Sequence, residues 1–202
     1  MTMLEFSHLA RPSAWDLGNE VLYALCADYP DHQDPEVVLA KLWLIGRAGS
    51  APLEQGRKTR GKRKTEDFYT GRAVPMVMAE PVDSWLAELE GTHLDWEHLP
   101  VILEVHGRLL TLFREVSGRA QRALTSKYLH FHRPDLFFLY DSRTAAAVRS
   151  EVSRPPTVPT SPGIDREYAL FARRCLRLIE KHGSDAPVEL TPRTLDRAIL
   201  GY

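Results

Sequence analysis

Cysteine is scarce in this sequence. Only Cys26 and Cys175 occur among the 202 residues, and both lie within apolar patterns of helical period. Two thiols so far apart along the chain argue against a disulfide framework and against a cysteine-based metal site. We therefore expect both to be reduced thiols in the core of a cytoplasmic protein.

Long apolar runs are missing as well. No stretch of the sequence approaches the roughly 18 to 20 apolar residues of a membrane span. The N-terminal segment also lacks a charged region followed by an apolar one, which is the pattern of a secretory signal. We expect neither export nor a membrane partner.

The sequence has no excess of charge of one sign, since 26 lysine and arginine residues stand against 27 aspartate and glutamate residues. The basic residues are unevenly distributed, however, and the block RKTRGKRK falls in a loop expected over residues 56–72. Such a block can neutralise phosphates in a salt-dependent way, or it can be a solvated loop without a specific role. We favour phosphate binding, with these six DNA-binding candidates: Arg57, Lys58, Arg60, Lys62, Arg63 and Lys64.

Familiar catalytic signatures are absent too. The chain has no phosphate-binding glycine loop, no nucleophile elbow and no HExxH sequence. Its histidines lack the spacing of a zinc motif. We expect no metal and no cofactor.

Helical periodicity is what the sequence does contain. The apolar pattern and its capping residues predict seven or eight helices, and a short extended piece is expected over 73–78. A proline-rich connector follows at 153–163. We therefore predict an all-α fold, a compact multi-helix domain over 1–202 that is either undivided or built from two lobes, 1–98 and 99–202. The predicted helices include residues 17–25, 35–45, 83–89, 100–117, 119–129, 142–150, 164–181 and 192–200. Asp34, Asp83 and Thr191 are expected to cap the helices that begin beside them.

Residues 116–148 contain the densest concentration of polar and aromatic chemistry. Asp141 stands where an extended segment turns into a helix, so its carboxylate is placed to cap the free N–H groups of that helix. A cap needs no functional explanation. The residues close to it in sequence exceed what a plain helix junction requires: Lys127, Tyr128, His130, His132, Tyr140 and Arg143.

Two segments resemble the helix-hairpin-helix DNA glycosylase superfamily. In that family a Leu-Pro-Gly-Val-Gly-x-Lys-x-Ala hairpin precedes a Val-Asp-Thr-His-Val segment, and here VSGRAQRA at 116–123 precedes YDSRT at 140–144. With Gly118 at the first hairpin glycine, Arg122 takes the place of the lysine and Asp141 follows 19 residues later. The hairpin proline and second glycine are missing, and the hairpin-like region, 105–150, is about a fifth of the chain. The resemblance implies the two-lobed fold of that family.

The resemblance also implies a chemistry, the release of a base from C1′ of a deoxyribose. Asp141 would stabilise the positive charge that builds on the sugar, while the family's lysine would attack the sugar to form a Schiff base. Arginine stays protonated, so Arg122 cannot do this, and the likeness is to the monofunctional branch, which releases a base without cutting the backbone. Lys127 is a second catalytic candidate, with an ordinary ion pair as its alternative.

The same resemblance suggests DNA as the partner, in preference to RNA. Gly118, Arg119, Arg122 and Arg143 are expected to contact its backbone. Aromatic and imidazole rings near Asp141 are candidates to stack on an extruded base, although most rings of this segment are also expected to pack in the core. These stacking candidates are Tyr128, His130, His132 and Tyr140.

Two other functions are compatible with these residues. The first is a non-catalytic nucleic-acid-binding or interaction module of the same fold, which the incomplete hairpin motif favours. The second is a metal-independent, RNase-like toxin in which His130, His132 and Arg143 act on a phosphodiester.

Overall fold

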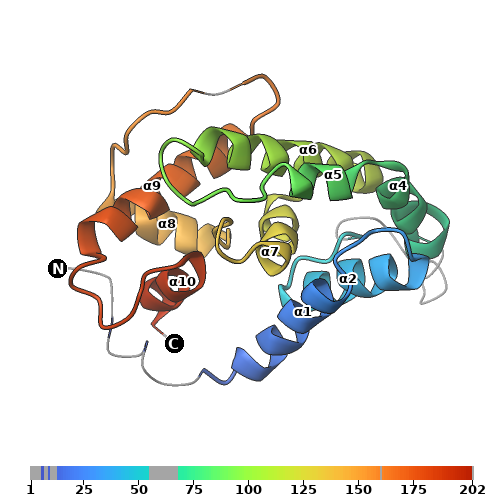
Figure 1. The fold of residues 1–202 in the computed structure, drawn as a ribbon, viewed down its shortest axis with the longest axis horizontal. Coiled ribbons are helices and arrows are strands. Elements are labelled where there is room, and N and C mark those ends of the chain that lie inside the picture. The colour runs from blue at the N-terminus through green and yellow to red at the C-terminus, as the bar shows by residue number, and fades with distance from the viewer. Residues whose placement is uncertain (1–5, 7–8, 10–12, 55–67, 160, 202) are drawn as a thin grey trace.

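The computed structural model describes residue 6, residue 9 and residues 13–54, 68–159 and 161–201. This part of the chain forms nine α-helices and one π-helical turn, and it contains no strand (Figure 1). The prediction of an all-α domain is confirmed. The six cations of the basic block, 57–64, lie outside the described residues.

Among the described residues, the longest connection between two helices is 152–165, which joins α8 to α9. The π-helical turn η1 (Tyr69–Ala73) leads directly into α4. The α-helices are α1 (Asp16–Asp28), α2 (Pro35–Ala48), α4 (Val74–Ala79), α5 (Val82–Ala87), α6 (Leu99–Ser117), α7 (Arg122–His132), α8 (Ser142–Glu151), α9 (Arg166–His182) and α10 (Pro192–Leu200).

Three local predictions were wrong. Residues 73–78 are helical, because Ala73, Val74 and Val77 form a buried helical face, which outweighs any strand preference of the valines. Asp83 does not cap α5, which begins at Val82; its carboxylate accepts hydrogen bonds from His32 instead. The helix expected to begin at residue 119 begins three residues later, after a turn that Gly118 opens in the left-handed region, at φ +80°.

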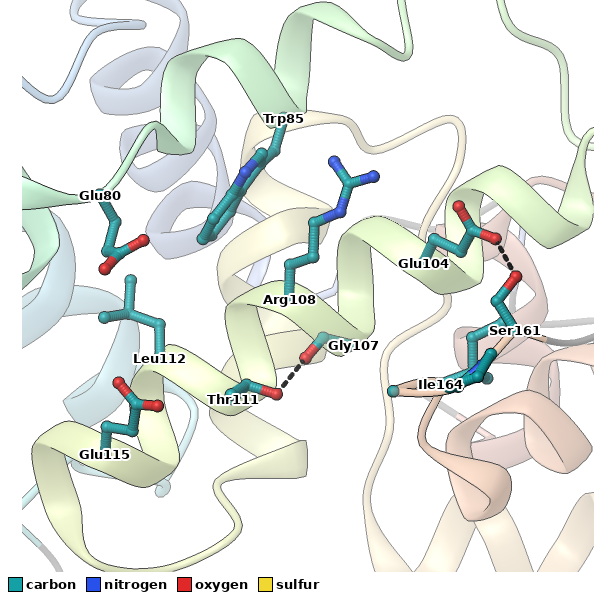
Figure 2. A pocket seen from close by; sticks show the side chains of 12 residues that line it. Glu80, Trp85, Glu104, Gly107, Arg108, Thr111, Leu112, Glu115, Ser161 and Ile164 are labelled. Atoms are coloured by element: carbon teal, nitrogen blue, oxygen red, sulfur yellow. Dashed lines mark hydrogen bonds between the residues drawn. The ribbon is translucent and has the colours of Figure 1, made fainter.

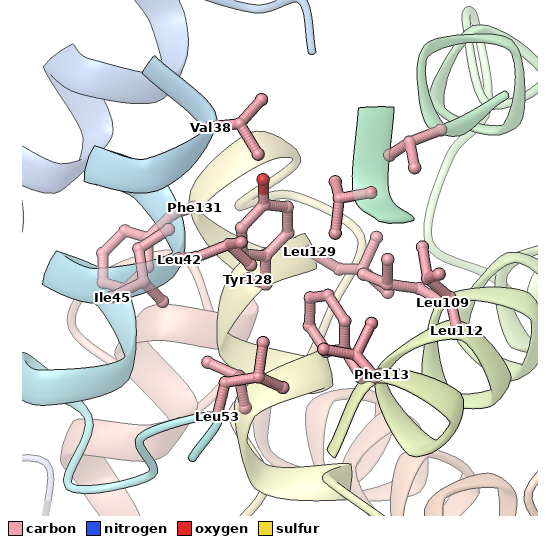
Figure 3. Close-up of a cluster of buried hydrophobic side chains, with 14 of the residues drawn as sticks. Val38, Leu42, Ile45, Leu53, Leu109, Leu112, Phe113, Tyr128, Leu129 and Phe131 are labelled. Carbon is pink, nitrogen blue, oxygen red and sulfur yellow. The ribbon is translucent and has the colours of Figure 1, made fainter. Parts of the chain in front are cut away.

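The buried apolar side chains form two clusters. The first joins α1, α2, η1, α4 and α5 to α6 and α7, and Tyr128 of α7 lies in its middle, surrounded by residues of α2 and α6 (Figure 3). The second cluster joins α8, α9 and α10 to Leu99 and Leu103 from the first turns of α6. Helix α6 therefore contributes to both clusters, whereas the predicted lobe boundary at residue 98 would place it wholly in the second lobe.

Helix α6 meets the second cluster at unusually close range. A Cβ atom on Gly107 would lie 2.5 Å from the carbonyl oxygen of Gly163, so only glycine lets this loop approach the helix. Beside it, His106 stacks on Tyr168 of α9 with ring centroids 3.6 Å apart and planes within 2°. These contacts fix α9 against α6.

Both cysteines are buried and unpaired, as the sequence predicted. Across the described ranges, none of the helices combines the length and the apolar character that crossing a membrane requires.

Candidate functional site

A cleft with a volume of about 750 Å³ brings together residues from the middle and both ends of the chain. Its lining residues come from the start of α1, the end of α2, α7, the start of α8 and α10, and Figure 1 labels these helices. Five of the predicted site residues line it: Arg122, Lys127, Tyr140, Asp141 and Arg143. The other lining residues are Trp15, Asn19, Ala48, Gly49, Ser50, Ala51, Ala120, Ala123, Phe131, Leu139, Ser142, Arg193, Asp196 and Leu200.

Asp141 caps α8, as the sequence predicted. One carboxylate oxygen accepts hydrogen bonds of 2.8 Å from the backbone N–H groups of Arg143 and of Thr144. These two donors fix the direction of the carboxylate, which is partly buried at the wall of the cleft. A negative charge at a helix N-terminus is also stabilised by the helix dipole.

Lys127 reaches the same cleft from α7. Its Nζ donates a hydrogen bond of 2.6 Å to the carbonyl oxygen of Gly49, at the end of α2. Burial lowers the pKa of the amine from its ordinary value, and the negative charges of Asp141 and Asp196 offset part of this effect. A lysine with a lowered pKa has more of the neutral amine that acts as a nucleophile.

Arg122 pairs with two acidic side chains, Asp165 directly before α9 and Glu167 in its first turn. Its guanidinium donates to both carboxylate oxygens of Asp165, at 2.6 and 2.8 Å, and pairs with Glu167 at 2.9 Å. It also lies 5.4 Å from the ring centroid of Tyr140. With two carboxylates beside it, Arg122 has little net charge to offer to a phosphate.

The remaining predicted DNA contacts lie on the surface near the cleft. Gly118 and Arg119 are exposed in the turn between α6 and α7, and Arg143 is exposed in the first turn of α8. In the residues that the structure covers, Arg143 makes no ion pair, so its charge is available. Their binding to DNA stays a prediction.

Two of the four stacking candidates require correction. Tyr128 and His130 are fully buried, so neither offers a ring face to a ligand. Tyr128 shares a 2.7 Å hydrogen bond with His32, and the half-buried His132 packs against both rings, with its centroid 5.1 Å from each. Period-two spacing and aromatic content could not reveal this, because α7 continues to residue 132 and carries Tyr128 and His130 into the core. Tyr140 alone lines the cleft.

One histidine of the RNase-like alternative, His130, is buried for the same reason. His130 is held by hydrogen bonds of 2.7 Å to the Tyr23 hydroxyl and 2.8 Å to the Phe137 carbonyl oxygen, which satisfy both ring nitrogens. Burial lowers its pKa to about 4, so the ring is neutral at physiological pH. His130 therefore cannot exchange protons with a bound phosphodiester.

No signal in the sequence indicates the two walls of the cleft that α1 and α10 supply. Trp15 and Asn19 come from α1, while Arg193 and Asp196 come from α10, and none belongs to a motif. Arg193 lies 3.4 Å from Asp16 and 3.7 Å from Asp196, so one guanidinium connects α10 to the start of α1. Only the tertiary structure brings these segments to Asp141.

A second hollow, of about 460 Å³, lies along the outer face of α6 (Figure 2). Carboxylates of Glu80, Glu104 and Glu115 line it, together with Trp85 and Arg108. Arg108 is paired with Glu88 at 2.6 Å, which leaves the hollow negative. Phosphate would be repelled there, so the cleft at Asp141 is the better candidate for a nucleic-acid site.

No group of three or more His, Cys, Asp or Glu side chains could hold a metal ion within the described ranges. Comparisons of the chain with models of protein families, with curated proteins and with solved structures found no match. Any functional assignment therefore depends on the residues of the cleft.

Proposed function

We propose that this protein binds DNA and hydrolyses the N-glycosidic bond of a base extruded from the duplex, as a divergent protein resembling the helix-hairpin-helix DNA glycosylases. The observation that carries the proposal is the meeting of Asp141 and Lys127 in one cleft. The cleft adjoins the turn between α6 and α7, where Gly118 adopts the left-handed conformation. Gly118 and Asp141 are positions at which the sequence resembles that family, whereas Lys127 lies five residues beyond Arg122, the position of the family's lysine.

In the proposed reaction the bond between C1′ and the base nitrogen breaks, and its electron pair leaves with the base. Positive charge then develops on C1′ and the ring oxygen of the sugar. The Asp141 carboxylate stabilises this charge, and its two backbone donors hold it in place without reorganisation. A water molecule adds to C1′ and gives its proton to the carboxylate or to solvent, which leaves an abasic site.

Asp141→Asn is the sharpest test of the catalytic role, because asparagine caps helices about as well as aspartate. The variant should fold and bind DNA, while base release from a duplex carrying a damaged base falls about 100-fold or more. Asp135→Asn is the matched control, since Asp135 is an exposed carboxylate outside the cleft. Equal rates for Asp141→Asn and the unaltered protein would contradict the proposal.

Binding should be measured first, by fluorescence anisotropy. Three labelled probes are needed: a duplex with a stable abasic-site analogue, the same duplex undamaged and a matching single-stranded RNA. The proposal predicts the tightest binding to the abasic duplex at two salt concentrations. Equal binding to all three probes would contradict base extrusion.

A second activity, cleavage of the backbone after base release, is favoured by the position of Lys127. The neutral amine would add to C1′ in place of water as the base leaves. The C1′–O4′ bond would then break to give an imine, with the proton of the amine passing to the ring oxygen, which becomes a hydroxyl, and elimination of the 3′ phosphate would follow. Sodium borohydride would reduce that imine to a stable amine and so link protein to DNA. Crosslinking that disappears in Lys127→Gln would support this activity, and base release without any crosslink would restrict the protein to water as nucleophile.

A further inference from the structure

Two side chains at the start of α1 line the cleft and stabilise neither the helix nor the core. Trp15 is 67% exposed, although it is among the largest side chains of the protein. Asn19 is partly buried, and within the described part of the chain its side-chain amide has no hydrogen-bond partner. Both residues line the cleft.

The two residues are positioned together by the first turn of α1. The backbone N–H of Asn19 donates to the carbonyl oxygen of Trp15 at 3.0 Å. Residues four apart lie on one face of a helix, so the indole and the amide are neighbours.

The start of α1 is itself held in place. One oxygen of Asp16 accepts a hydrogen bond of 2.6 Å from the backbone N–H of Ser13, and the other lies 3.4 Å from Arg193 of α10. The indole therefore stands beside a fixed point of contact between the two ends of the chain.

We propose that Trp15 and Asn19 read the extruded base: the indole stacks on its face, and the Asn19 amide forms hydrogen bonds with its edge. This inference depends on the proposed function, and it adds the recognition elements that the reaction chemistry does not define. An amide offers one donor group and one acceptor, so it selects a base edge on which an acceptor and a donor are adjacent. A ring face accepts any base. Trp15 thus contributes affinity for DNA whose extruded base occupies the cleft, and Asn19 determines which base is preferred.

The test compares two duplexes that differ only in whether a base is present. One carries a stable abasic-site analogue, and the other carries 2-aminopurine at the same position, on a fluorinated sugar that resists base release. Binding of each is measured for the unaltered protein, Trp15→Ala, Trp15→Phe and Asn19→Leu. Trp43→Ala is the matched control, because Trp43 is also exposed, at 45%, but lies outside the cleft.

Trp15→Ala should weaken binding of the 2-aminopurine duplex about ten-fold or more, because stacking on an aromatic side chain is lost. Binding of the abasic duplex should change less than about two-fold. The affinity of Trp15→Phe for the 2-aminopurine duplex should lie between those of Trp15→Ala and the unaltered protein. Trp43→Ala should bind as the unaltered protein does. The fluorescence of bound 2-aminopurine should rise in Trp15→Ala, since the indole no longer quenches it.

The Asn19→Leu variant tests the edge contact separately. It should bind the abasic duplex normally, and it should lose most of the preference that the unaltered protein shows among duplexes with different bases. Equal weakening of the abasic and base-bearing duplexes by Trp15→Ala and Asn19→Leu would overturn the inference while leaving the proposed function intact. An unaltered protein that fails to prefer the abasic duplex over undamaged DNA would overturn both.

Discussion

The side-chain amine of Lys127 donates a hydrogen bond to the carbonyl oxygen of Gly49, and this contact joins the middle of α7 to the residue that ends α2. A Cβ atom on Gly49 would lie 2.6 Å from Cδ and 3.3 Å from Nζ of Lys127. The lysine therefore reaches its position only because residue 49 has no side chain.

Gly49→Ala is expected to displace Lys127 without unfolding the protein, because the nearest atom, at 2.6 Å, belongs to this flexible side chain, and the backbone oxygen of Ile45 is 3.0 Å away. Borohydride crosslinking to a duplex with a natural abasic site, whose C1′ is an aldehyde, should fall at least several-fold, as it should in Lys127→Gln. Gly18→Ala is the control, since a Cβ there has no atom within 4 Å. That variant should retain crosslinking and be more stable by about 0.5 to 1 kcal/mol, because alanine favours a helix over glycine. Unchanged crosslinking in Gly49→Ala would show that the amine is not held through this contact.

Arg122 and Arg143 should differ in their effect on the salt dependence of DNA binding. Arg143→Ala removes an exposed cation beside the cleft, so the slope of log K against log salt should decrease in magnitude by about one. Arg122→Lys should leave the slope unchanged, since two carboxylates already balance that charge. It should instead lower the free energy of unfolding by about 1 to 3 kcal/mol, because lysine cannot form the paired hydrogen bonds to Asp165. Titrations at four salt concentrations and urea unfolding measure both effects, and a reduced slope in Arg122→Lys would contradict this assignment.

The cap formed by Asp141 should be separable from its proposed chemistry. Asp141→Ala should lower the free energy of unfolding by about 1 kcal/mol, because the N–H groups of Arg143 and Thr144 lose their acceptor. Asp141→Asn should cost less than about 0.5 kcal/mol. Urea unfolding of the two variants measures the difference. A loss as large in the asparagine variant as in the alanine variant would mean that the charge, and not the cap, stabilises α8.

Stability should decrease as the pH falls below neutrality. Burial lowers the pKa of His106 to about 3 and that of His130 to about 4, whereas histidines of the unfolded chain titrate near 6.5. The unfolded state therefore binds more protons between these values, so the stability present above pH 6.5 is lost as the pH falls toward 4. Between pH 7.5 and 5.5 the two rings together should cost about 3 kcal/mol.

Urea unfolding at these two pH values checks the histidine prediction, and His106→Leu isolates one ring. Neither nitrogen of His106 has a hydrogen-bond partner in the described structure, so leucine leaves no polar group unsatisfied there. The variant should lose about half as much stability over the same pH range. An identical pH dependence in the variant would assign the effect to other groups.

The helices could be predicted from the sequence wherever a periodic apolar face and a capping residue coincided. Asp34 caps α2 and Thr191 caps α10 with the prolines next to them, and Asp141 caps α8, all as expected. The failures lay where packing overrode local preference. Residues 73–78 became helical to bury one face against other helices, and α7 extended to residue 132.

The site was predictable in part, because Lys127, Tyr140 and Asp141 are close in sequence as well as in space. Trp15 and Arg193 could not be found this way. They belong to α1 and α10, and nothing in their local sequence indicates that these two helices would meet at α7 and α8. The burial of individual side chains could not be predicted from the sequence either, so rings such as Tyr128 were expected at a surface that they do not reach.

Helix α6 supplies buried residues to both apolar clusters. The close contact between Gly107 and Gly163 leaves no space between α6 and the loop that precedes α9. The two halves of the molecule thus have a structural element in common. Neither half can lose its order without exposing part of the other, so denaturation should occur as one cooperative transition, with coincident midpoints for probes placed in α2 and in α9.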